Sequence, residues 1–166
     1  RTGRHPAVAG LPPHLSQHTF DAIYQSAERF DEVYQRIADE VLRLGAEGDV
    51  LYAVPGNPFV GESTVAAIRR GATERGLDVR VVAGLSFIEP TLAALGIDAL
   101  DGLQLFDAID VAAVLYPPLN PDVPVLLGQV YSRLLAGELK LALMSIYPAI
   151  HQMALVHAAG EADDWM

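Results

Sequence analysis

Residues 49–84 constrain the fold more than any other part of the sequence. Residues 50–54 are a short, almost wholly apolar run bounded by glycine and proline, which is typical of a buried parallel strand. Residues 62–75 follow with the spacing of an amphipathic helix, which Gly76 is suited to end. Residues 79–83 are a second β-branched run. A strand, a helix and a strand in this order predict a right-handed parallel crossover, so we expect an α/β fold.

Periodicity and turn residues predict further elements on both sides of this unit. The second expected helix is the strongest, because Val33, Ile37 and Val41 recur on one face. The second expected helix covers residues 31–44, and further helices are expected over residues 20–27, 90–95 and 132–145. Further strands are expected over residues 125–131 and 152–158.

A proline-rich segment suggests how the chain is divided. Pro117, Pro118, Pro121 and Pro124 lie close together, and such a segment continues neither a helix nor a central strand. We therefore expect a first α/β lobe over residues 1–116, a linker over 117–124 and a second, smaller α/β lobe over 125–166. The first lobe is expected to hold the mainly parallel sheet.

Composition excludes several classes of protein. The chain has 166 residues, of which 51% are hydrophobic and 19% charged, as expected of a globular chain. A net charge of −10 disfavours a hold on nucleic acid, and no apolar run reaches the roughly 18 residues of a membrane helix. The chain contains no cysteine, which excludes thiolate metal sites and is compatible with a cytoplasmic location.

The loop after the first expected strand nearly spells a phosphate-binding loop. Residues 56–63 read Gly, four residues, Gly, Glu, Ser, so Glu62 stands where such loops carry a lysine that holds phosphates. A carboxylate there would repel a nucleoside triphosphate, which leaves a plain strand-to-helix turn or a different ligand. Ligands of open α/β sheets bind at the carboxyl ends of strands, and residues 55–58 and 84–87 form glycine-containing loops at two such ends. We expect a small-molecule site between these loops.

Neither a metal site nor a catalytic side chain is predicted. Five carboxylates around the second helix suggest Mg²⁺ binding, but a solvated helix face explains them better. His14 and His18 are four residues apart, yet they follow two prolines in an expected loop. Ser86 lacks the second glycine of a nucleophile elbow. The five carboxylates are Glu28, Asp31, Glu32, Asp39 and Glu40.

The order of these motifs resembles a known family. Residues 52–58 (Tyr-Ala-Val-Pro-Gly-Asn-Pro) and 84–87 (Gly-Leu-Ser-Phe) resemble the paired loops of the tetrapyrrole (corrin/porphyrin) methylases, which usually read Gly-Asp-Pro and Gly-x-Ser-Ser. The chain more closely resembles the methylase-like amino-terminal domain fused to MazG-type nucleoside triphosphate pyrophosphohydrolases. The opening Arg-Thr-x-Arg-His-Pro and the segments 30–34, 104–108, 129–131 and 140–148 fit that subgroup.

This resemblance implies a two-lobed α/β protein, usually a homodimer, that binds S-adenosylmethionine in the cleft between its lobes. It also implies a small-molecule methyl acceptor, whose identity stays open. Such a site needs little acid–base chemistry, because the protein mainly aligns the acceptor with an already activated methyl group. The cofactor-binding positions carried over are Pro55, Gly56, Asn57, Val60, Gly84, Ser86, Phe87, Gln129 and Val130.

Two departures from the family pattern affect the expected function. Asn57 stands where the methylases generally carry aspartate, so a negative charge near the cationic cofactor is missing. The family's first strand is expected before Arg1 and its last strands after Met166, so both lobes are expected to be incomplete and to associate through open sheet edges. Two functions therefore stay open: a methyltransferase-like domain, or a non-catalytic dimerisation or regulatory module with a degenerate pocket.

Overall fold

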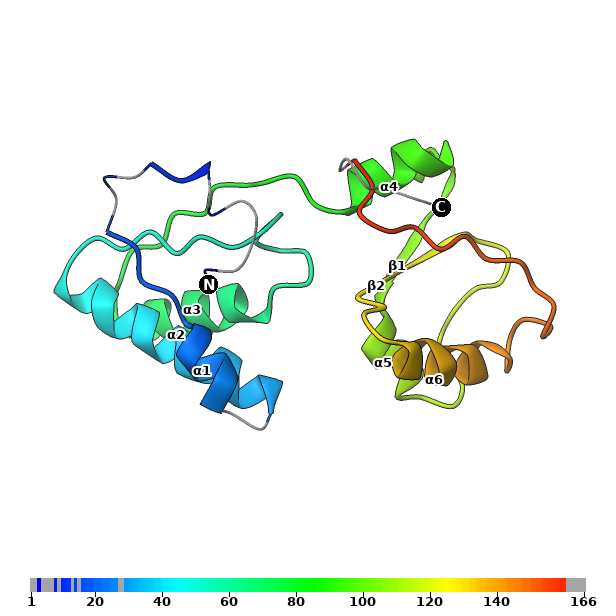
Figure 1. Cartoon of the computed structure of the whole chain (residues 1–166), viewed down its shortest axis with the longest axis horizontal. Coiled ribbons are helices and arrows are strands. Elements are labelled where there is room, and N and C mark those ends of the chain that lie inside the picture. Colours follow the sequence, from blue (N-terminus) through cyan, green and yellow to red (C-terminus); the bar gives the residue numbers. More distant parts are fainter. Residues whose placement is uncertain are drawn as a thin grey trace. The chain divides into compact units, whose positions relative to one another are not determined.

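The computed structural model describes residues 3, 8, 10–12, 14, 16–26 and 29–160. The chain divides into two compact units, Arg1–Ser86 and Phe87–Met166. Helices dominate the first unit, and a small parallel sheet with helices forms the second (Figure 1). The protein is therefore an α/β protein, as expected.

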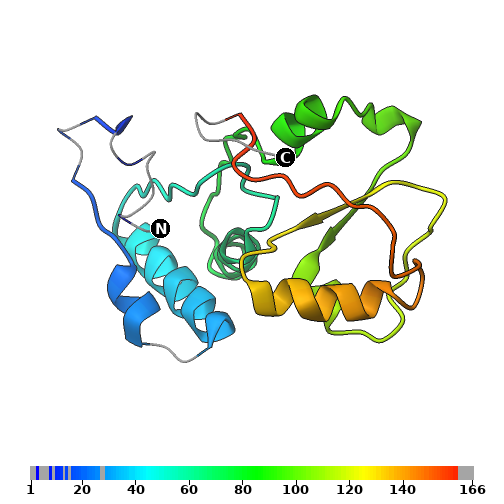
Figure 2. The ribbon, with the colours of Figure 1, turned by 45° about the vertical axis from the view of Figure 1, so that its right-hand side comes forward.

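The first unit is built on the packing of helices α2 (Phe30–Glu47) and α3 (Ser63–Glu74), with the short α1 (Asp21–Ser26) beside α2 (Figure 2). The apolar stripe of α2 faces the core, since Val33 and Ile37 are almost fully buried. These helices confirm the predictions over residues 20–27, 31–44 and 62–75 within the described residues. The core residues are Phe20, Val33, Ile37, Ala38, Val41, Leu42, Ile68 and Ala72.

Close contact between α2 and α3 depends on a small residue. A Cβ built on Gly71 would lie 2.5 Å from Cδ1 of Leu42, so this position admits no larger side chain without a shift of the leucine. The last turn of α3 is followed by Gly76 at φ +66°, which confirms that residue as the helix terminator.

The prediction of two strands in the first unit is wrong. Residues 50–54 and 79–83 form no strand in the described part of the chain. Leu51 is 82% exposed and Val82 is 71% exposed, so these runs are not covered on both faces as a buried parallel strand must be. An apolar, β-branched run forms a strand only where a neighbouring strand accepts its backbone hydrogen bonds, and periodicity does not show whether that neighbour is present.

The parallel sheet lies in the second unit. Strands β1 (Gln104–Asp107) and β2 (Val125–Gly128) pair in parallel, in a register that runs from Gln104 opposite Val125 to Asp107 opposite Gly128. The sequence predicted β2, although as a longer strand to residue 131, and did not predict β1. The expected strand over residues 152–158 is absent, apart from an isolated bridge at residue 157.

Helices α5 and α6 pack against the sheet and complete the hydrophobic core of the second unit. Leu135, Leu139 and Leu143 of α6 (Arg133–Leu143) pack with α5 (Ala108–Ala112) against side chains of both strands. Ser132 caps α6 by accepting a hydrogen bond from the Leu135 amide at 3.1 Å, close to the predicted start of this helix. The unit opens with α4 (Ile88–Leu95), ended as predicted by Gly96, and the one-turn helix η2 (Ala99–Asp101).

The proline-rich segment lies between the paired strands β1 and β2. Because β1 and β2 pair, the proline-rich residues 117–124 form a connection within the second unit. The side chain of Gln104 holds this connection: its amide nitrogen donates to the carbonyls of Asn120 (2.8 Å) and Val123 (2.9 Å), and its oxygen accepts from the Asn120 amide at 2.9 Å. Among the described residues, no helix is long and apolar enough to cross a membrane.

Candidate functional site

The two glycine-containing loops of the first unit are in direct backbone contact. A Cβ built on Gly84 would overlap the carbonyl oxygen of Gly56 and lie 3.2 Å from its carbonyl carbon. Gly56 has φ +77°, a conformation that favours glycine, and a Cβ there would lie 3.4 Å from the Leu85 carbonyl oxygen. The expected closeness of the two loops is therefore observed, although the strands that were expected to bring them together are not.

Asn57 ties these two loops together. Its side-chain nitrogen donates a hydrogen bond to the Gly84 carbonyl at 3.0 Å, and its side-chain oxygen accepts from the Phe59 amide at 2.9 Å. The Val60 amide donates to the Asn57 carbonyl at 3.1 Å, which closes a tight turn. An ionised aspartate accepts hydrogen bonds but donates none. Asparagine at position 57 is therefore explained by the hydrogen bond that its side chain donates to Gly84, a contact that the sequence alone does not reveal.

The loop pair exposes glycine residues together with apolar side chains, since Leu85 is 77% exposed and Phe59 is 58% exposed. Pro55, Gly56 and Gly84 are exposed, whereas Asn57 and Val60 are half-buried. Ser86, which was expected to face the cofactor, is only 7% exposed. Exposed glycines offer peptide groups, and exposed apolar side chains offer packing area, to a ligand that needs no catalytic side chain. In these respects the residues present fit S-adenosylmethionine.

A buried polar network joins residues on both sides of the first loop, and the sequence analysis did not predict its contacts. Glu62 is 9% exposed, and its carboxylate accepts hydrogen bonds from the Thr64 amide at 3.2 Å and from the Thr64 hydroxyl. Thr64 is fully buried, and its hydroxyl lies 3.0 Å from the Tyr52 hydroxyl. The network thus joins the segment before the loop to the helix after it.

The three other expected residues lie in the second unit. The Phe87 ring packs on Gly128, where a Cβ would come within 2.8 Å of Cζ. Gln129 is exposed and has the unusual φ of +66°, and its amide donates to the carboxylate of Asp107, which also accepts from the Ile109 amide at 2.8 Å. These residues mark the carboxyl ends of β1 and β2.

Val130, in contrast, packs against the hydrophobic core of the second unit. Asp107 is the residue at this edge that the sequence analysis missed as a candidate. The strand that it ends was not predicted, so no signal placed it beside Gln129.

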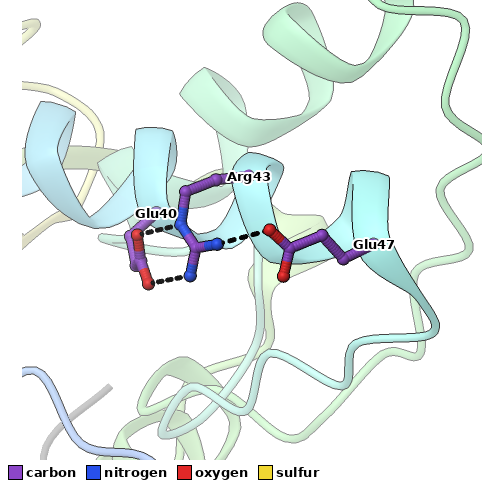
Figure 3. Close-up of polar contacts among 3 residues, drawn as sticks. All are labelled: Glu40, Arg43 and Glu47. Atoms are coloured by element: carbon purple, nitrogen blue, oxygen red, sulfur yellow. Dashed lines mark hydrogen bonds and ion pairs between the residues drawn. The ribbon is translucent and has the colours of Figure 1, made fainter.

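The acidic face of α2 is a solvated ion-pair surface, as predicted. Arg43 donates to both carboxylate oxygens of Glu40 at 2.8 Å and to Glu47 at 2.6 Å (Figure 3). The hydrogen bonds from Arg43 hold the pKa of Glu40 below its usual range. In the described part of the chain, no group of three or more metal-ligating side chains is found. Glu28 lies outside the described residues.

Comparison with known proteins identifies the class. The model of the Tetrapyrrole (Corrin/Porphyrin) Methylases matches residues 2–164, so the chain belongs to this family of S-adenosylmethionine-dependent methyltransferase-like proteins. It is also similar to "Uncharacterized protein YabN" of Bacillus subtilis (strain 168), with 35% identity over 161 residues. The match covers 96% of this chain and 32% of YabN, so the chain spans about a third of that relative's length.

Proposed function

We propose that this chain is a methyltransferase-like domain that binds S-adenosylmethionine at the contact between the loops of Gly56 and Gly84. The backbone contact between these two glycines is the observation that carries the proposal, because it places two sets of peptide groups together at an exposed surface. Family membership supports the choice of cofactor. The bound cofactor supplies a methyl group already activated on a sulfonium, for a small-molecule acceptor.

The chain's own residues then have a positioning task. Asn57 keeps the two loops at a fixed separation, and the tight turn to Val60 presents the peptide groups of the first loop. Pro55 limits the backbone freedom of that loop before ligand arrives. Fixed backbone groups of this kind orient a ligand with little loss of entropy on binding. The expected contact of Ser86 with the cofactor belongs to the same proposal.

Calorimetric titration with S-adenosylhomocysteine and S-adenosylmethionine tests this function. We expect saturable binding of both ligands with one site per chain, and no heat of binding with ATP as the control ligand. ATP shares the adenosine but carries phosphates that Glu62 disfavours. Absence of binding to both S-adenosyl ligands would contradict the proposal.

The alternative is a non-catalytic dimerisation or regulatory module with the same fold. The engagement of Asn57 favours it, because both ends of this side chain are used to hold the loops together rather than left for a ligand. The same titration separates the two functions. Failure to bind either S-adenosyl ligand supports the module, whereas binding together with methyl transfer to an added acceptor supports the enzyme.

We also propose that the two units correspond to the two lobes of the family fold and that the domain belongs to a larger, MazG-type fusion protein. The length of YabN supports this, because the match covers 32% of that relative and the other 68% (100 − 32) lies outside it. The full-length parent protein is then expected to release pyrophosphate from nucleoside triphosphates in a Mg²⁺-dependent manner. A parent protein without this activity would contradict the fusion proposal.

Homodimer formation is proposed as well. Val82 is 71% exposed and Leu85 is 77% exposed in the first unit, and neighbouring apolar side chains at a protein surface often mark an interface. Sedimentation equilibrium is expected to give twice the mass of 17.8 kDa. A single species of the monomer mass across the concentration range would exclude the dimer.

A further inference from the structure

Arg69 of α3 lies over the aromatic ring of Phe59, which belongs to the first glycine-containing loop. The central carbon of the guanidinium is 5.3 Å from the centre of the ring, which makes this a cation–π contact. Arg69 is exposed, and Phe59 is 58% exposed. The loop therefore has an aromatic ring and a positive charge together at the protein surface.

Hydrogen bonds connect this pair to the contact between the two loops. The Phe59 amide donates to the side-chain oxygen of Asn57 at 2.9 Å, and the side-chain nitrogen of Asn57 donates to the Gly84 carbonyl at 3.0 Å. Residues 55–61 and 84–86 contain no ionisable side chain of their own. Arg69 thus brings a charged group into contact with a loop pair whose own side chains are neutral.

Arg69 has no carboxylate partner in the part of the chain that the structure describes. On α2, by contrast, Arg43 pairs with both Glu40 and Glu47. On α3, the positions three and four residues from Arg69, where a helical ion pair would form, hold no acidic residue. These positions are Val65, Ala66, Ala72 and Thr73. The positive charge of Arg69 is therefore available to an anionic group of a ligand.

The ring contact holds the guanidinium without using up its hydrogen-bond donors. A guanidinium has several N–H donors in one plane, and a contact with a single ring occupies at most those that face the ring. Among the described residues, none accepts a hydrogen bond from the Arg69 guanidinium. A guanidinium that is held in this way and keeps unused donors is suited to bind a carboxylate through two parallel hydrogen bonds.

We propose that Arg69, held by the Phe59 ring, binds the carboxylate of the amino-acid group of S-adenosylmethionine and makes the loop pair select ligands that carry this group. The inference rests on the proposed function and adds the residue that recognises the amino-acid end of the ligand. One guanidinium matches one carboxylate, whereas the several charges of a triphosphate exceed it, so the expectation for ATP is unchanged.

The test compares S-adenosylhomocysteine with its decarboxylated analogue, which keeps the adenosine, the sulfur and the amine and lacks only the carboxylate. Calorimetry gives the dissociation constant of the analogue divided by that of S-adenosylhomocysteine. We expect Arg69→Gln to lower this ratio by about tenfold, because glutamine removes the charge and the paired donors. Arg69 is exposed, so the variant is expected to fold.

Arg70→Gln is the matched control for this substitution. It makes the same chemical change at the next residue of α3, which is also exposed and has no ring contact among the described residues. We expect the ratio of the two dissociation constants to stay at the wild-type value. An equal fall of the ratio in both variants would assign the preference to the general charge of α3 and contradict the role of Arg69.

Phe59→Leu tests the part that the ring plays. Leucine keeps an apolar side chain on the loop but removes the aromatic face, so Arg69 is no longer held in place. We expect the ratio to fall by about threefold, as loss of an exposed cation–π contact implies. A wild-type ratio in Phe59→Leu would contradict the positioning of Arg69 by the ring.

The outcomes separate this inference from the proposed function. Wild-type protein that binds neither S-adenosylmethionine nor S-adenosylhomocysteine overturns both. Wild-type protein that binds S-adenosylhomocysteine no more tightly than the decarboxylated analogue overturns the inference alone. If Arg69 only supports the loop, Arg69→Gln weakens both ligands by the same factor and the ratio stays at the wild-type value, which also overturns the inference alone.

Discussion

Gly84→Ala is expected to abolish binding of S-adenosylhomocysteine. The new Cβ would overlap the carbonyl oxygen of Gly56, and this obstacle is backbone rather than the end of a flexible side chain. The two loops must therefore separate, which also strains the hydrogen bond from Asn57 to the Gly84 carbonyl. We expect a loss of about 1–3 kcal/mol in the free energy of unfolding. Calorimetry measures the binding and thermal unfolding the stability.

A glycine elsewhere provides the matched control for this substitution. Gly137 lies inside α6, and a Cβ built there meets nothing within 4 Å. Gly137→Ala is expected to stabilise the protein by about 0.5–1 kcal/mol, because alanine is the better helix former, and to leave binding unchanged. Wild-type affinity in Gly84→Ala would show that the loop contact is not needed for the cofactor.

Ile37→Ala is expected to have the largest effect on stability. Ile37 is fully buried at the centre of α2, where it packs within the core formed by α2, α3 and Phe20. Truncation removes buried apolar contacts and leaves a cavity, which costs about 2–5 kcal/mol. Urea unfolding monitored by circular dichroism measures this loss as a lower midpoint.

The control for Ile37→Ala is the substitution of an exposed helical leucine, which shows whether the loss of stability comes from burial or from the change of residue within a helix. Leu134 lies in α6 and is 74% exposed, so Leu134→Ala should change the free energy of unfolding by less than about 0.5 kcal/mol. An equal effect of the two substitutions would mean that the core is not centred on Ile37.

The helices other than α5, which the sequence analysis did not predict, were predictable because their determinants are local. The spacing of Val33, Ile37 and Val41 defines the buried face of α2, and Gly76 and Gly96 end their helices with left-handed backbone that glycine adopts readily. Each signal is contained within one or two turns of chain. The elements that it predicts therefore need no knowledge of distant residues.

The strands were not predictable in the same way. An apolar run such as residues 50–54 satisfies the pattern of a buried strand, but whether it becomes one depends on a partner strand at a place that its own residues do not specify. Conversely, β1 exists because residues 104–107 meet residues 125–128 in register, across a connection held by Gln104. The sheet is thus a product of pairing, and local periodicity is a weak guide to it.

The sequence by itself determined the helices other than α5, the two glycine-containing loops and the family to which they belong, because these depend on backbone freedom and residue spacing. Only the tertiary structure decided what those residues do. It brought Gly84 against Gly56, used the amide of Asn57 to join the loops and buried Glu62 at the start of α3. The reason is physical: close approach, hydrogen-bond direction and desolvation arise between residues that are distant along the chain, and none is a property of any single residue.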